Sequence, residues 1–128
     1  METVKATNID SMKLYQNYDR LRNEIEVIKG ELKGEKLLAK HLYRFDTMHY
    51  YGVDSVRESM TSVLEKIKGK AEGSKPVRVL DFGSGLGGPA RFMADELDCE
   101  VVAVEIQKES SDMGADVTLD VGLSDRVT

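Results

Sequence analysis

The residues of this 128-residue chain that could bind a nucleotide-like ligand form one short segment, 79–89, which reads VLDFGSGLGGP. Gly83, Gly85 and Gly87 follow an apolar run that is typical of a β-strand, and Asp81 lies two residues before the first glycine. Glycines at a strand-to-helix turn let the backbone approach a ligand without a Cβ atom in the way. The first N–H groups of the following helix would face an anionic part of that ligand.

A second carboxylate follows at the matching place. Glu105 lies near the end of the next β-rich run, 99–106, and comes 20 residues after Gly85. An acid at the end of that strand can accept hydrogen bonds from both hydroxyls of a ribose. The glycines and Glu105 therefore predict a site for an adenosine-containing cofactor.

Asp81 favours one of two such cofactors. Gly83, Gly85 and Gly88 satisfy the G-x-G-x-x-G pattern of NAD-binding folds. A carboxylate beside a pyrophosphate is unfavourable, however, whereas it would attract the α-amino group of S-adenosylmethionine. Asp81 therefore favours S-adenosylmethionine, and an NAD-binding dehydrogenase fragment is the alternative.

The segments 79–88 and 101–105 resemble motif I and the acidic strand end of class I S-adenosylmethionine-dependent methyltransferases. Three further segments are similar to the small-molecule branch that includes phosphoethanolamine and sarcosine/dimethylglycine N-methyltransferases: 48–52 (MHYYG), 87–91 (GGPAR) and 122–128 (GLSDRVT). The resemblance implies a Rossmann-like α/β fold, incomplete in this chain and preceded by N-terminal helices. It also implies an enzyme that transfers a methyl group to a small-molecule acceptor, in particular an amine.

The same resemblance implies which residues bind the cofactor. The glycine turn would line the methionine moiety, with Asp81 near its amine, and Glu105 would bind the ribose. The expected cofactor-binding residues of the turn and the second strand end are Asp81, Gly83, Ser84, Gly85, Gly87, Glu105, Ile106 and Gln107, the last two beside the adenine. Catalytic residues stay unassigned, because the acceptor side of such a site is expected beyond Thr128.

The aromatic residues suggest a cover for this site. All five tyrosines and both histidines precede Gly52, and tyrosine rings attract sulfonium and ammonium cations. In the resembling families the N-terminal helices fold over the cofactor as a lid. We therefore expect Tyr50 and Tyr51 to contact the cofactor and His49 to belong to the lid, with simple packing as the alternative.

The rest of the pattern indicates how the site is positioned. Residues 1–70 are predicted as a helical lid or cap region, 71–76 as a linker, and 77–128 as the first part of the Rossmann-like domain. Helical spacing of apolar residues predicts three N-terminal helices, over 14–32, 37–45 and 56–67, the last capped by Asp54 or Ser55. Strand, glycine turn, helix and strand form a βαβ unit with parallel strands, and a further helix is expected over 107–121.

Composition excludes several classes of partner. The net charge of −5 and the lack of a basic stripe argue against nucleic acid. No apolar stretch approaches the ~20 residues of a membrane span and no signal peptide is recognisable, so a cytoplasmic protein is expected. The single cysteine, Cys99, excludes an internal disulfide and a cysteine-rich metal site, and its place in an apolar run predicts a buried thiol.

Two expectations concern association. Two parallel strands with open edges would be marginally stable. We therefore expect a fragment of a longer enzyme, inactive alone, that associates with a complementing chain or with itself through these edges. Alternatively, the apolar stripe over 14–32 would form a coiled coil in a non-enzymatic interaction module.

Overall fold

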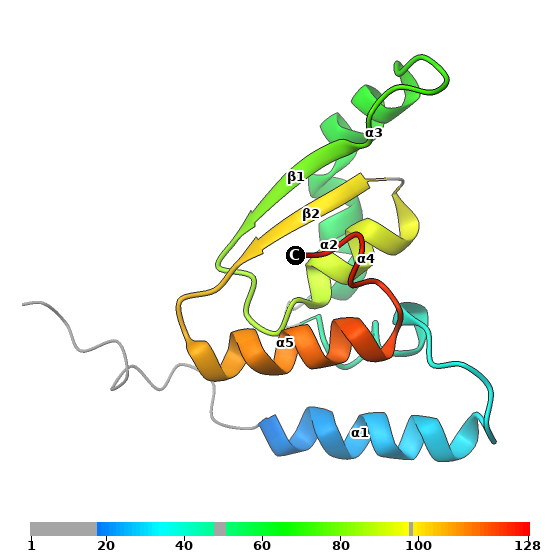
Figure 1. Cartoon of the computed structure of the whole chain (residues 1–128), viewed down its shortest axis with the longest axis vertical. Helices are drawn as coiled ribbons and strands as arrows, with labels where there is room; N and C mark the ends of the chain where they lie inside the picture. Colours follow the sequence, from blue (N-terminus) through cyan, green and yellow to red (C-terminus); the bar gives the residue numbers. More distant parts are fainter. Residues whose placement is uncertain (1–17, 48–50, 98) are drawn as a thin grey trace, which may run out of the picture.

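The computed structural model describes residues 18–47, 51–97 and 99–128 (Figure 1). Its elements are α1 (Tyr18–Glu31), the 3₁₀ turn η2 (Ala39–His41), α2 (Gly52–Ser59), α3 (Thr61–Lys68), β1 (Val77–Phe82), α4 (Gly88–Glu96), β2 (Cys99–Val104) and α5 (Lys108–Asp120). The predicted strand, turn, helix and strand are therefore formed, and the α/β fold class is confirmed.

The strands β1 and β2 are parallel and pair in register from Val77 opposite Cys99 to Phe82 opposite Val104. They are parallel because α4 returns the chain to the same end of the sheet before β2 begins. The Cys99 thiol is buried in this unit and donates to the carbonyl of Met93 (3.3 Å), as expected for a structural cysteine.

The edge of β2 away from β1 is partly paired, which corrects the expectation that both outer edges are open. Val127 forms a parallel bridge with Val101. The N–H of Thr128 donates to the carbonyl of Val101 (3.0 Å), and the N–H of Ala103 donates to the carbonyl of Thr128 (2.7 Å). The turn after α5 brings these residues back beside β2, where they form an isolated parallel bridge.

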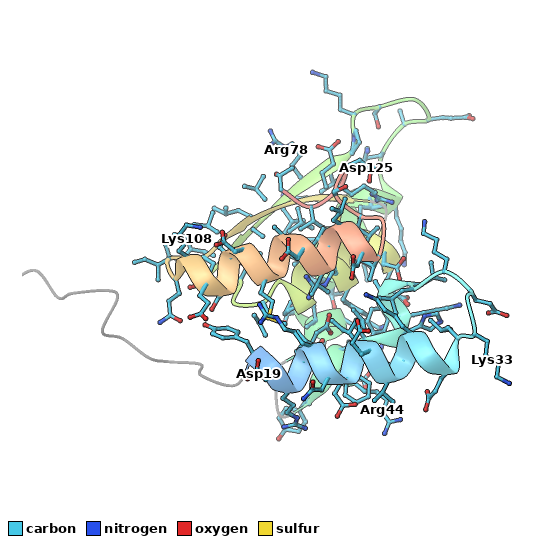
Figure 2. All side chains as sticks on the ribbon, turned by 60° about the horizontal axis from the view of Figure 1, so that its bottom comes forward. Asp19, Lys33, Arg44, Arg78, Lys108 and Asp125 are labelled. Carbon is cyan, nitrogen blue, oxygen red and sulfur yellow. The ribbon has the colours of Figure 1, made fainter. Side chains whose placement is uncertain are left out.

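Helix α1 packs on α5, and the two lie side by side (Figures 1 and 2). Its stripe of Leu21, Ile25 and Ile28 is buried in one cluster with Met113 and Val117 of α5. Charged side chains such as Lys33 and Lys108 lie at the outer surface (Figure 2). These apolar residues of α1 are already buried against α5 of the same chain. The coiled-coil alternative is therefore wrong for the described part of the stripe.

A second cluster joins the sheet to α4 and α2. Its buried members include Phe92 and Met93 of α4, Val56 of α2 and Val101 of β2. The ring of Phe92 packs edge-on against the ring of Tyr43, whose hydroxyl donates to the carboxylate of Asp95 (2.7 Å). Burial, reinforced by that carboxylate, raises the pKa of Tyr43.

The opposite face of the sheet is left largely exposed by the described residues. Leu80 and Phe82 of β1 are 64% and 84% exposed, and Val104 of β2 is 39% exposed. Parallel sheets are generally covered on both faces. This face of the sheet therefore carries exposed apolar side chains.

One predicted helix is not formed, and another is formed in two pieces. Residues 37–45 form only the turn η2, because Leu38 is extended (φ −121°, ψ 155°) and its N–H donates to Nδ1 of His41 (3.2 Å). The region 56–67 is divided at Met60 into α2 and α3.

The predicted cap of α2 is also wrong, because the helix begins at Gly52 and places both candidates within its first turn. Ser55 donates to the carbonyl of Gly52 (2.9 Å) and Asp54 pairs with Arg57 (2.7 Å). Over the described ranges, no helix is long and apolar enough to cross a membrane.

Candidate cofactor site

The turn between β1 and α4 is built around three glycines with left-handed backbones. Gly83, Gly85 and Gly87 have φ values of 81°, 55° and 76°, which L-residues with a Cβ rarely adopt. The N–H groups of Gly83 and Ser84 donate to the carbonyl of Val104 (2.8 and 3.0 Å). These bonds hold the turn against the end of β2.

The turn also leaves room for a ligand. A Cβ atom built on Gly83 or Gly85 would meet no atom within 4 Å. The last glycine, Gly87, is the N-cap of α4, and Pro89 lies in the first turn of that helix. The helix start predicted from proline is confirmed. The first N–H groups of an α-helix have no partner within the helix.

Glu105 ties the turn to the segment after β2. One carboxylate oxygen accepts from the N–H of Gly85 (2.8 Å) and the other from the N–H of Gln107 (2.8 Å). A carboxylate has about four acceptor positions. Two acceptor positions are therefore left for hydroxyl groups of a ligand.

The other predicted site residues take different positions. Asp81 is half-buried on the face of β1 that carries Val77 and Val79. Ile106 is 66% exposed and Tyr51 is 81% exposed, so neither side chain is packed into the core. His49 and Tyr50 lie outside the described residues. The structure thus brings together the glycine turn, Glu105 and Gln107, but does not bring Tyr51 into a packed contact with them.

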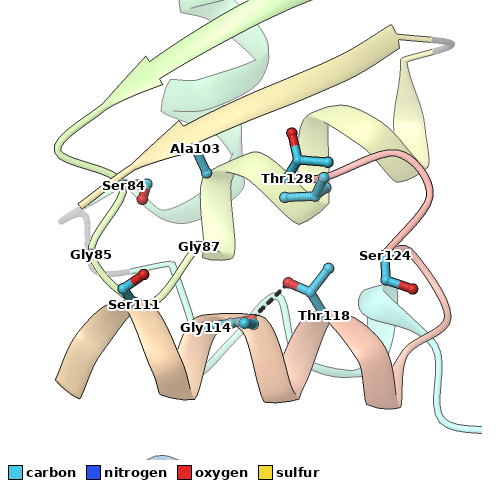
Figure 3. A pocket seen from close by; sticks show the side chains of 11 residues that line it. Ser84, Gly85, Gly87, Ala103, Ser111, Gly114, Thr118, Ser124 and Thr128 are labelled. Atoms are coloured by element: carbon cyan, nitrogen blue, oxygen red, sulfur yellow. Dashed lines mark hydrogen bonds between the residues drawn. The ribbon is translucent and has the colours of Figure 1, made fainter. Parts of the chain in front are cut away.

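A pocket of about 160 Å³ opens beside the turn (Figure 3). Ser84, Gly85 and Gly87 line one side, and Gly114 and Thr118 of α5 lie opposite, where the Thr118 hydroxyl donates to the carbonyl of Gly114 (2.7 Å). A Cβ on Gly114 would be 3.1 Å from the carbonyl oxygen of Leu86, so glycine permits this close approach. In the sequence, only the small size of the α5 residues indicated that this helix could line a pocket.

A buried ion pair underlies the turn. The guanidinium of Arg91 in α4 lies 3.1 Å from the carboxylate of Asp46, and the two side chains are 0% and 1% exposed. Burial raises the pKa of Asp46 and the charge of Arg91 opposes this rise. Burial likewise lowers the pKa of Arg91, against the attraction of Asp46. Nothing in the sequence pattern pairs these two residues.

Gly88 is required by packing. A Cβ on this residue would lie 2.0 Å from the backbone oxygen of Asp46, so the segment 42–47 rests directly on the start of α4. The pattern of glycines indicated Gly88 only as a possible dinucleotide-binding residue. Among the described residues, no cluster of three or more His, Cys, Asp or Glu could hold a metal ion.

Sequence comparison identifies relatives, although no family model matches the chain. A cyclopropane-fatty-acyl-phospholipid synthase of Escherichia coli (strain K12) is 32% identical over 82 residues, which cover 59% of this chain and 22% of the synthase. A glycine/sarcosine/dimethylglycine N-methyltransferase of Actinopolyspora halophila is 26% identical over 70 residues, which cover 55% of this chain and 12% of that enzyme. The chain thus spans less than a quarter of the length of either relative.

Among solved structures, a "putative sarcosine dimethylglycine methyltransferase" from Galdieria sulphuraria aligns with a TM-score of 0.48 and 19% identity, covering 83% of this chain and 40% of that one. Methyltransferases of this class use S-adenosylmethionine. The predicted resemblance is confirmed by the two sequence relatives: over a little more than half of its length, this chain is similar to S-adenosylmethionine-dependent methyltransferases.

Proposed function

We propose that this chain binds S-adenosylmethionine at the glycine turn and supplies the cofactor side of a methyl-transfer site. The observation that carries the proposal is the Glu105 carboxylate, which joins the N–H groups of Gly85 and Gln107. This arrangement presents the remaining acceptor positions of Glu105 next to a backbone that lacks Cβ atoms. Both parts of an adenosine-methionine ligand would then be bound, because Glu105 would bind the ribose and the glycine turn would bind the amino-acid part.

Each residue of the turn has a separate task in this proposal. Gly83 and Gly85 leave the space that the methionine moiety occupies, and Ser84 lines it. The negative charge of Asp81 attracts the α-amino group, while Ile106 and Gln107 flank the adenine. When bound, S-adenosylmethionine supplies an electrophilic methyl group, and this chain holds and orients it.

The N-terminal region would close the site. We propose that residues 1–70 form a cap, that 71–76 link it to the sheet domain, and that Tyr51, with His49 and Tyr50, belongs to a lid. The exposure of Tyr51 supports this, because an exposed ring is available to a ligand or to a further segment. Exclusion of water by such a lid would strengthen the electrostatic contacts in the site.

An amine is the acceptor that we propose. The similarity to a glycine/sarcosine/dimethylglycine N-methyltransferase supports a small amine. The name of the other relative points instead to a fatty-acyl phospholipid. A methyl-transfer assay with sarcosine in one arm and unsaturated phospholipid vesicles in the other separates the two classes.

Calorimetry tests the cofactor directly. We expect S-adenosylhomocysteine to bind and NAD to give no heat, because Asp81 would face the NAD pyrophosphate. Tight binding of NAD without binding of S-adenosylhomocysteine would favour the dehydrogenase alternative and refute the proposal.

A further inference from the structure

We propose that Asp46 and Arg91 are positioning residues for the cofactor-binding turn, so that the segment 42–47 controls the shape of the turn. This inference rests on the proposed function for its consequence in ligand binding. Its structural part concerns the unliganded chain and can be tested alone. Neither residue has an expected contact with the cofactor.

The first step is the contact between Arg91 and the turn. The N–H of Arg91 donates to the carbonyl of Gly87 (2.9 Å). Its guanidinium then folds back beneath the same glycine, where a Cβ on Gly87 would lie 3.0 Å from Nη1. Arg91 therefore supports the last left-handed residue of the turn from below.

The second step is that this guanidinium is itself fixed by two other segments. Nε and Nη2 donate to one carboxylate oxygen of Asp46 (3.3 and 3.1 Å). Nη1 donates to the carbonyl of Gly114 and to the hydroxyl of Thr118 in α5 (both 3.1 Å). The planar fork of arginine makes these contacts in fixed directions, which the single ammonium of lysine cannot reproduce.

The third step is that Asp46 supports the turn through both its side chain and its backbone. Its side chain binds Arg91, and its backbone oxygen lies against Gly88 at the start of α4. A movement of the segment 42–47 would therefore displace both the cap of α4 and the support beneath it. Segment 42–47 leads directly to the lid residues of the proposed function.

Stability alone is a weak explanation for this pair. A buried ion pair is often no more stabilising than apolar residues of the same volume, whereas removal of one partner is strongly destabilising. A charged pair that is fully buried next to a ligand-binding turn is better explained by the orientation that it imposes.

The double variant Asp46→Leu with Arg91→Met separates orientation from stability, because it removes both charges and replaces the buried ion pair with apolar side chains. The matched control is Asp54→Leu with Arg57→Met, which removes an exposed ion pair of α2. Amide hydrogen exchange of Gly85 and Gly87 in the unliganded chain reports the turn, and calorimetry with S-adenosylhomocysteine reports binding.

We expect the buried double variant to unfold at a temperature close to that of the wild type. Exchange at Gly85 and Gly87 should nevertheless rise about tenfold, and the dissociation constant should rise up to about 100-fold. The control should leave both readouts unchanged. Unchanged exchange at the two glycines in a folded double variant would overturn the inference.

A milder variant serves if the double variant does not fold. Thr118→Val removes one acceptor of Arg91 and keeps the shape of the side chain. We expect faster exchange at Gly87 in this variant, and wild-type exchange there would also count against the inference. Altered exchange without any binding of S-adenosylhomocysteine by the wild type would leave the positioning role intact and refute the proposed function instead.

Discussion

Replacement of Glu105 by glutamine perturbs the proposed cofactor site with the smallest change of shape. Glutamine has one carbonyl oxygen, so only one of the two N–H groups, that of Gly85 or that of Gln107, would keep its acceptor. The amide nitrogen of glutamine is a donor, so it would face a backbone N–H group and could not accept a hydrogen bond from a ribose hydroxyl. A hydrogen bond to a charged group contributes about 1.5–3 kcal/mol. The loss of one such bond to the ligand corresponds to a rise of about 10- to 150-fold in the dissociation constant.

Titration calorimetry with S-adenosylhomocysteine at constant ionic strength measures this change. Glu105→Ala removes all acceptors and should weaken binding at least as much as glutamine does. The matched control is Glu109→Gln, because Glu109 is an exposed glutamate in the first turn of α5 and changes the net charge equally. Thermal unfolding of each variant shows whether the fold persists.

Two results would refute the reasoning. Wild-type affinity in the glutamine variant would show that Glu105 does not receive the ribose. An equal loss in the Glu109→Gln control would show that net charge, and not the geometry of the site, governs binding.

Four further outcomes are expected. Gly85→Val should abolish binding of S-adenosylhomocysteine in calorimetry, because φ of 55° is strained for valine and its side chain would enter the open space of the turn. Gly88→Ala should lower the free energy of unfolding in urea by about 1–3 kcal/mol, since its Cβ would lie 2.0 Å from the Asp46 backbone oxygen. The pKa of Tyr43 is raised above its ordinary value of 10.0, so its contribution to stability is complete below that pH and is lost as the pH rises further. Tyr43→Phe should therefore flatten the alkaline limb of the stability profile, measured by urea unfolding at pH 8 to 11. Phe82→Lys should reduce self-association in light scattering, because Phe82 is the most exposed apolar side chain of the sheet; an unchanged molar mass would contradict this.

Local patterns in the sequence were sufficient to predict the unit formed by β1, the glycine turn, α4 and β2. Alternation of side chains in 77–82, the glycines after it and Pro89 each act on neighbouring residues, so they predict a strand, a turn and a helix without knowledge of the rest. The spacing from Gly85 to Glu105 then determines that the carboxylate lies beside the turn, because two parallel strands in register end together. The helix expected over 107–121 is likewise present as α5.

The spacing of apolar residues predicted a helix over 37–45 that the structure does not contain. Leu37 and Leu42 are buried as a helical stripe would be, but an extended Leu38 and a single 3₁₀ turn bury them equally well. The spacing records which residues are buried and does not determine the backbone that buries them.

Only the tertiary structure decided what supports the turn. Asp46 and Arg91 are 45 residues apart, and Gly114 is a further 23 residues along the chain. Each of them looks ordinary in its own segment, because an aspartate, an arginine or a glycine there suits a surface as well as a core. Their roles arise where α4, α5 and segment 42–47 meet closely enough to exclude water. Once water is excluded, every buried donor needs a partner and every added atom needs space. Whether these conditions are met depends on how the elements pack together, so no local stretch of sequence can show it.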